Sequence, residues 1–197
     1  MTHYFTDNSE LKSKQSQFTY YFNNEKFIFN TDIGVFSKNN IDFGSYLLLK
    51  NTYAKDLGKR VLDLGCGYGP IGIIIKHFQK DIELDMVDIN SRALDLAKIN
   101  SQLNNVVSNV IKSEDITTLN KKYDSILLNP PIRAGKEIIF DLYEKAYKCL
   151  DNGGNLYIVI QKKQGSSSSK KRLEDLFDEV KVIDRDNGYH ILQSCKY

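Results

Sequence analysis

Asn129, Pro130 and Pro131 follow the apolar stretch 125–128 and have the clearest chemical potential in this chain. Two consecutive prolines hold the backbone extended and remove two N–H donors, so the Asn129 side-chain oxygen and the backbone carbonyls remain as acceptors. An amino group conjugated to a ring is a poor nucleophile because its lone pair is delocalised. Acceptors that bind both of its protons direct that lone pair at an electrophile. The motif, with Ile132, therefore predicts catalysis of group transfer to an amine.

A second feature is the stretch 65–69, called the glycine loop below, in which Gly65, Gly67 and Gly69 alternate with other residues. It lies between a short apolar strand and a helix. Glycines let a ligand approach the backbone, and a helix start aims unpaired N–H groups and the positive end of its dipole at that ligand. The spacing differs from the G-x-G-x-x-G of nicotinamide enzymes. It therefore predicts a nucleotide-like cofactor of another kind.

Acidic residues end three expected strands around this loop. Asp88 closes the second strand, at about the 20-residue offset from the glycines at which a carboxylate binds ribose hydroxyls. Asp63 would meet the ammonium of an amino-acid moiety, directly or through water. Glu114 and Asp115 end the third strand, where a carboxylate could bind an adenine amine, and Asp115 is favoured over Glu114. Acidic residues are also common caps and turn residues, which is the alternative explanation for each.

Strands and helices alternate from residue 60 onward, and this alternation must position the motifs. The pattern predicts strands at 60–64, 82–87, 106–111, 125–128 and 155–160, helices at 70–79, 91–103, 136–150 and 170–177, and a closing antiparallel hairpin from 180–183 and 189–194. Such an order requires a mostly parallel sheet with helices on both faces. Its ligand belongs at the carboxyl ends of the strands, where the glycine loop, Asp88 and Asn129 all fall.

Residues 1–56 are expected to form an N-terminal extension, and residues 57–197 the main domain. The string F-T-Y-Y-F-N-N-E-K-F-I-F predicts a β-hairpin that turns at Asn23 and Asn24. A short strand is expected at Val35 and Phe36, followed by a helix that packs on the core from Gly44 to about residue 56.

Composition is that of a globular protein, with 41% hydrophobic and 26% charged residues among 197. No apolar run approaches the ~20 residues that span a bilayer, and the first 15 residues lack the apolar centre of a signal peptide. The three cysteines lack metal-ligand spacing and suit a reducing compartment. A cytoplasmic protein with neither membrane nor metal partners is therefore expected. The net charge of +2 confines any nucleic-acid surface to a local patch.

Together, the stretch 63–69, Asp88 and the stretch 129–132 resemble the class I S-adenosylmethionine-dependent methyltransferases. The string N-P-P-I-R-A-G-K, with V-F-S-K-N-N-I-D-F-G-S-Y-L-L-L upstream, is similar to the methyltransferase small-domain family, which includes guanine-N2 methyltransferases of 16S ribosomal RNA. The resemblance runs from about Phe18 to the C-terminus. It implies an α/β, Rossmann-like, seven-stranded and mostly parallel sheet with an antiparallel last strand. It also implies S-adenosyl-L-methionine as the cofactor.

The resemblance assigns roles to individual residues. It implies cofactor contacts at Asp63, Gly65, Cys66, Gly67, Gly69, Asp88, Ile89, Glu114, Asp115 and Asn129. It further implies that the methionine end of the cofactor and the target base are covered by Phe36, Asp42, Phe43, Gly44 and Ser45, with Phe43 and Gly44 on the cofactor side. A buried linker and helix cap is the alternative for these five residues.

Two departures from the family pattern bear on the substrate. The double-domain ribosomal enzymes have a full extra N-terminal domain, whereas only about 55 residues precede the first core strand here. Many amino-methyltransferases also have an aromatic residue after the prolines, and this chain has Ile132. A flat base would then be held between Ile132 and an aromatic such as Phe36 or Phe43.

Basic residues around the motif suggest RNA as the substrate. Arg133 and Lys136 follow the prolines, and the serine run 166–169 is flanked by Lys162, Lys163, Lys170, Lys171 and Arg172. These charges would suit phosphates, and the serine run would become ordered on binding. A solvated loop and helix face explains the same charges.

The expected activity is N-methylation of RNA, at the N2 amine of a guanine in 16S ribosomal RNA, with ribosomal RNA or the small ribosomal subunit as partner. A protein glutamine methyltransferase, a DNA adenine methyltransferase, a non-catalytic RNA-binding module and a nicotinamide oxidoreductase are the alternatives. A monomer and a homodimer are both compatible with the sequence.

Overall fold

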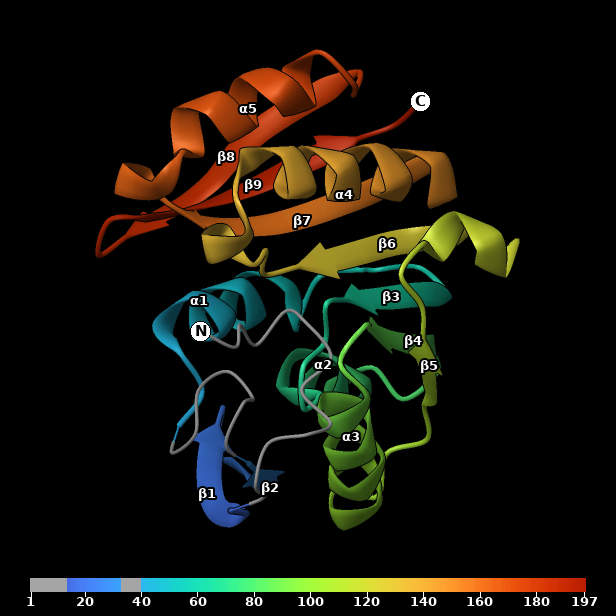
Figure 1. The fold of residues 1–197 in the computed structure, drawn as a ribbon, viewed down its shortest axis with the longest axis vertical. Coiled ribbons are helices and arrows are strands. Elements are labelled where there is room, and N and C mark those ends of the chain that lie inside the picture. Colours follow the sequence, from blue (N-terminus) through green and yellow to red (C-terminus); the bar gives the residue numbers. More distant parts are fainter. Residues whose placement is uncertain (1–13, 33–39) are drawn as a thin grey trace.

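A seven-stranded sheet runs through the molecule (Figure 1). Its strand order is β5 (Asn109–Lys112), β4 (Glu83–Asp88), β3 (Arg60–Leu64), β6 (Tyr123–Leu128), β7 (Leu150–Gln161), β9 (Tyr189–Cys195) and β8 (Glu179–Asp186). β9 runs antiparallel to β7 and β8, and the other neighbouring strands pair in parallel. The computed structural model describes residues 14–32 and 40–197. The predicted mixed sheet with an antiparallel last strand is confirmed.

Helices cover both faces of this sheet. One face carries α1 (Phe43–Thr52), α2 (Pro70–Phe78) and α3 (Ser91–Leu103), and the other carries α4 (Lys136–Cys149) and α5 (Ser166–Glu174). Because successive side chains of a strand point to opposite faces, Val61 belongs to the first core and Leu62 to the second. In the described part of the chain, short 3₁₀ turns complete the connections: η1 (Ile116–Leu119), η2 (Ile132–Ala134) and η3 (Lys162–Gln164). No helix within the described ranges is long and apolar enough to cross a membrane.

A separate hairpin of β1 (Ser16–Phe22) and β2 (Glu25–Thr31) packs beside α3 (Figure 1). It turns at Asn23 and Asn24, both with positive φ, as predicted. The edge of β2 is closed by amides of α3, because Asn100 and Asn104 each donate to and accept from its backbone at 2.7–3.0 Å. These amides take the place of a neighbouring strand. The domain boundary at residues 56 and 57 stays a prediction.

Two predicted elements are wrong. The helix expected to begin at residue 170 begins at Ser166, so the serine run is helical and not a loop. Ser166 Oγ hydrogen-bonds His190 Nδ1 at 2.7 Å, and Tyr143 OH donates to Ser169 Oγ at 3.1 Å. These tertiary partners occupy hydroxyls that would otherwise compete for the helix backbone. The strand expected at 155–160 is also longer than predicted, because residues 151–154, which the prediction leaves between a helix and a strand, lie inside β7, and β7 follows α4 directly.

Smaller differences lie nearer the N-terminus. The helix expected to reach about residue 56 ends at Thr52, and the third core strand begins at Asn109 and not at residue 106. The short strand expected at Val35 and Phe36 lies outside the described residues.

Candidate functional site

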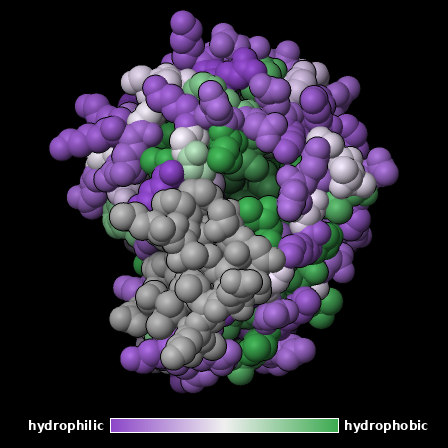
Figure 2. Space-filling model, in the orientation of Figure 1, coloured by the Kyte–Doolittle hydropathy of each residue, from purple (hydrophilic) through white to green (hydrophobic). Residues whose placement is uncertain are grey.

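A pocket of about 710 Å³ opens at the carboxyl ends of β3, β4, β6 and β7. The glycine loop and Asp88 form one half of its wall, and Asn129 lies between them and a second half built from β7 and β9. Figure 2 shows a hollow lined by hydrophobic residues on the face in view, with hydrophilic residues around it. The pocket therefore lies where open α/β sheets generally bind their ligands, at the carboxyl ends of the strands.

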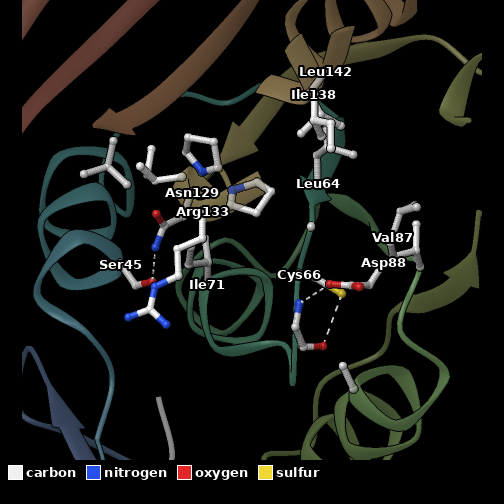
Figure 3. Close-up of a pocket in the computed structure, with 18 of the residues that line it drawn as sticks. Ser45, Leu64, Cys66, Ile71, Val87, Asp88, Asn129, Arg133, Ile138 and Leu142 are labelled. Atoms are coloured by element: carbon white, nitrogen blue, oxygen red, sulfur yellow. Dashed lines mark hydrogen bonds between the residues drawn. The ribbon is translucent and has the colours of Figure 1, made fainter. Parts of the chain in front are cut away.

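The glycine loop uses its own N–H groups inside the protein. Gly65 and Cys66 donate to the Val87 carbonyl at 2.8 and 3.0 Å, and Gly67 donates to Asp88 Oδ2 at 2.8 Å (Figure 3). Gly69 donates to the Cys66 carbonyl at 3.0 Å. The expectation that the loop aims unpaired N–H groups at a ligand is therefore wrong for these four residues. The loop turns so tightly that β4 and the loop itself supply the acceptors.

Close packing under the loop nevertheless leaves room for a ligand above it. A Cβ added at Gly72 would lie 2.9 Å from Met86 Sδ, so α2 can approach β4 only with glycine there. At Gly65 and Gly67, both with positive φ, an added Cβ would meet no atom within 4 Å and would enter the open pocket. The backbone surface is therefore available to a ligand.

Two acidic residues lie at this half of the pocket, Asp88 in its wall and Asp63 behind it. Asp88 lines the pocket and also accepts from the Asn90 N–H at 2.9 Å. Burial raises the pKa of Asp88, and its backbone hydrogen bonds oppose that rise. Asp63 is 1% exposed and accepts from the Gly72 N–H at 2.8 Å. Burial raises the pKa of Asp63 to about 7, against the Gly72 hydrogen bond, and the Asp88 charge adds to the rise.

Not every acidic residue expected in the site reaches the pocket. Asp63 does not line it and lies behind the loop, and its expected contact with an ammonium, directly or through water, stays a prediction. Glu114 lines the pocket together with Ser113. The Asp115 carboxylate instead caps η1, accepting from Thr117 N at 2.9 Å and Thr117 Oγ1 at 2.7 Å. Asp115 Oδ1 is thus engaged in a cap while Glu114 reaches the pocket wall. The preference for Asp115 over Glu114 stays a prediction.

Asn129 is held by the start of α1. Its Nδ2 donates to Ser45 Oγ at 2.9 Å (Figure 3) and approaches Asp42 Oδ1 at 3.4 Å. Within residues 14–32 and 40–197, no hydrogen bond reaches Asn129 Oδ1 or the Pro130 carbonyl, whereas the Pro131 carbonyl accepts from Ala134 N at 2.8 Å. Two acceptors therefore remain open beside the pocket, as the motif predicts.

The second half of the pocket contains residues that the sequence did not single out. They are Val159, Ile160, Gln161, Gln164 and Tyr189. A ring carbon of Tyr189 would lie 3.3 Å from a Cβ at Gly44, and the Asp42 carboxylate 3.0 Å from it, so Tyr189 sits beside the group that holds Asn129. The predicted topology could have indicated Tyr189. It is the first residue of an antiparallel strand, and such a strand begins at the edge of the sheet where its parallel neighbours end.

The remaining expected site residues divide into three groups. Those that line the pocket are Cys66, Ile89, Pro130, Pro131, Ile132 and Arg133. Those that do not line it are Gly69, Phe43, Gly44, Lys136, Lys162 and Lys163. Phe43 packs against the first core and Tyr189, with 5.5 Å between the ring centroids. Phe36 lies outside the described residues. Of the basic residues, Lys170 pairs with Glu174 and Arg172 with Glu144. Their expected phosphate contacts stay a prediction.

The chain matches the family model of the methyltransferase small domain over residues 26–193. It is 40% identical over 197 residues to the uncharacterized protein YbxB of Bacillus subtilis (strain 168), with 98% of each chain covered. It is 35% identical over 166 residues to the ribosomal RNA small subunit methyltransferase C of Psychromonas ingrahamii, with 82% of this chain and 46% of that relative covered.

A solved structure of a T. thermophilus 16S rRNA N2 methyltransferase in complex with AdoMet and guanosine has a TM-score of 0.84 to this chain. The two are 23% identical, and the match covers 95% of this chain and 52% of that one. This likeness shows the fold. The chain thus spans about half the length of the ribosomal RNA methyltransferases that it matches.

Proposed function

This chain belongs to the methyltransferase small-domain family and is an S-adenosyl-L-methionine-dependent methyltransferase, and from this premise we propose that it methylates RNA. The proposed target is the N2 amine of a guanine in 16S ribosomal RNA. The observation that carries the proposal is the pair of open acceptors, Asn129 Oδ1 and the Pro130 carbonyl, in the same pocket as the glycine loop.

The residues of the first half of the pocket fit the cofactor. S-adenosyl-L-methionine supplies a methyl group activated by a positively charged sulfonium. In the glycine loop the N–H groups of Gly65, Cys66, Gly67 and Gly69 are already bonded. With Asp63 and Asp88 close by, such a loop favours a cation over a phosphate. In this proposal the cofactor rests on the backbone of Gly65 and Gly67. Asp88 accepts hydrogen bonds from its ribose hydroxyls, and Glu114 and Ser113 lie at its adenine.

The chemistry at the acceptor side needs no strong base. Asn129 Oδ1 and the Pro130 carbonyl accept the two protons of the target amine and turn its lone pair toward the methyl group. As the new N–C bond forms, the bond between the methyl group and sulfur would break, leaving a neutral thioether, and one proton of the amine would then pass to water. The acceptors therefore need only orient the amine and stabilise its developing positive charge. Prolines at 130 and 131 hold both acceptors in place.

Two features support a nucleobase in RNA. Tyr189 and Ile132 both line the pocket, and Tyr189 supplies an aromatic face of the kind on which unpaired bases stack. Four basic residues are exposed and form no ion pair in the part of the chain that the structure describes: Arg133, Lys136, Lys162 and Lys163. Cations near the pocket are suited to backbone phosphates. The names of the ribosomal RNA relatives point to the same substrate class.

The proposal is tested by transfer of a labelled methyl group to three acceptors: protein-free 16S ribosomal RNA, assembled small subunits and total protein. We expect label in RNA, at N2-methylguanine after digestion to nucleosides. Label confined to glutamine side chains of a protein would instead support the glutamine methyltransferase alternative and refute the RNA substrate.

A further inference from the structure

A hydrogen-bond relay joins α1 to the catalytic motif across 84 positions of the sequence. The Ser45 hydroxyl donates to Asp42 Oδ2 at 2.6 Å, and Asn129 Nδ2 donates to the Ser45 oxygen at 2.9 Å (Figure 3). Asp42 also caps α1, because its Oδ1 accepts from Ser45 N at 3.1 Å. Resting on the function proposed above, we propose that Asp42 and Ser45 are positioning residues that keep the Asn129 amide oxygen, and not its NH₂ group, facing the target amine.

The direction of the relay follows from the inventory of donors. A carboxylate only accepts, so the single proton of the Ser45 hydroxyl is committed to Asp42. Ser45 Oγ can then only accept from Asn129, which must present its nitrogen. With the amide reversed, Asn129 Oδ1 would face the Ser45 oxygen and Asp42 Oδ1, and three acceptors would meet without a proton between them. The relay therefore selects one of two amide orientations that have nearly the same shape.

The relay is built on a rigid support. Ser45 is 4% exposed, so water has little access to replace it. Leu47, Leu48 and Leu49, which follow it on α1, are fully buried in the first core. Held in this way, Asn129 keeps its oxygen free before any substrate arrives, which lowers the cost of orienting it in the transition state.

The sharpest variant is Asp42→Asn, which keeps an N-cap oxygen for Ser45 N. The new amide nitrogen would donate to Ser45 Oγ and release the hydroxyl proton toward Asn129. Asn129 would then present its oxygen to Ser45 and its NH₂ group to the target amine. We expect single-turnover transfer to fall about 100-fold or more, by analogy with the loss of one oxyanion-hole group. The Tm and the Kd for S-adenosyl-L-methionine should stay unchanged.

A reciprocal variant separates this role from a merely structural one. In the double variant Asp42→Asn/Asn129→Asp, the Ser45 hydroxyl can donate to one carboxylate oxygen of the new side chain at position 129. The second oxygen of that carboxylate then faces the target amine. We expect this double variant to be at least tenfold faster than either single variant. Tyr46→Phe, on the same turn of α1 but outside the pocket, is the matched control and should keep the wild-type rate.

A second readout needs no substrate. In ¹⁵N-resolved spectra, the Asn129 side-chain NH₂ should exchange slowly in the wild type and faster in Asp42→Asn, because it leaves Ser45. An unchanged exchange rate, or a wild-type transfer rate in Asp42→Asn, would overturn the relay. Failure of the wild type to methylate RNA, with the exchange difference present, would instead refute the proposed function and leave the relay standing.

Discussion

The two halves of the pocket differ in whether their polar groups are already hydrogen-bonded within the protein. In the half built on β3 and β4, four N–H groups of the glycine loop (residues 65, 66, 67 and 69) and that of Gly72 are bonded to acceptors within the chain. In the half reached through Asn129, two acceptors are open and an aromatic ring lies close by. The first half is suited to binding by shape and charge, and the second to making new hydrogen bonds as the reaction proceeds. Binding and chemistry should therefore separate under mutation.

The largest effect is expected from Asn129→Ala, because it removes one of the two open acceptors. Single-turnover methyl transfer should fall by about 10²–10³-fold, the usual loss for one preorganised group. The Kd for S-adenosyl-L-methionine, measured by calorimetry, should change little. An equal loss in transfer rate and cofactor affinity would show that the two halves are not separable.

Asp88→Ala is the complementary test on the first half. It removes a carboxylate from the pocket wall and leaves the Gly67 N–H without its acceptor. Cofactor affinity should fall about 10–100-fold, as expected for a charge-assisted hydrogen bond. Asp95→Ala, on the exposed side of α3, is the control, since Asp95 pairs with Lys98 at 3.7 Å and its side chain is 73% exposed. Calorimetry showing no loss for Asp88→Ala would remove Asp88 from the cofactor site.

Tyr189→Ala tests whether the second half holds a base. Loss of one stacking partner costs about 1–3 kcal/mol, so the KM for RNA should rise roughly fivefold or more while cofactor affinity stays constant. Tyr189→Phe keeps the ring and should behave as wild type. A rise in the cofactor Kd for Tyr189→Ala would place the ring in the first half instead.

The smallest effect expected is a pH dependence of cofactor binding through Asp63. Burial raises the pKa of Asp63 to about 7 from an ordinary value of 3.8, so the free protein loses unfolding free energy as pH rises from about 4 to 7. A cationic cofactor favours the charged form and releases the proton. Its affinity should therefore increase about two- to tenfold between pH 6 and 8 and then level off.

Asp63→Asn provides the control for this dependence, because the amide oxygen can still accept from the Gly72 N–H. Its cofactor affinity should be nearly constant over the same range of pH. A slope that persists in this variant would assign the proton to another group, of which Asp88 is the first candidate because its pKa is also raised.

Local sequence patterns determined much of the architecture. The strand Arg60–Leu64 and the helix Ser91–Leu103 have the predicted bounds, and the Asn23-Asn24 turn is where the sequence indicated. Glycines, prolines and period-two or helical spacing act over a few residues, so they can be identified without knowing the neighbours in space. The same reasoning placed the glycine loop and Asn129 at one edge of the sheet.

The tertiary structure alone decided how the side chains in the pocket are used. It placed Glu114 on the wall and turned Asp115 to a cap, joined Asn129 to Ser45, and brought Tyr189 to the pocket from the last strand. It also made the serine run helical through contacts with His190 and Tyr143. Each of these outcomes depends on which groups meet across strands and helices far apart in the sequence. Hydrogen-bond partners are set by that packing, and residue types and spacing do not encode it locally.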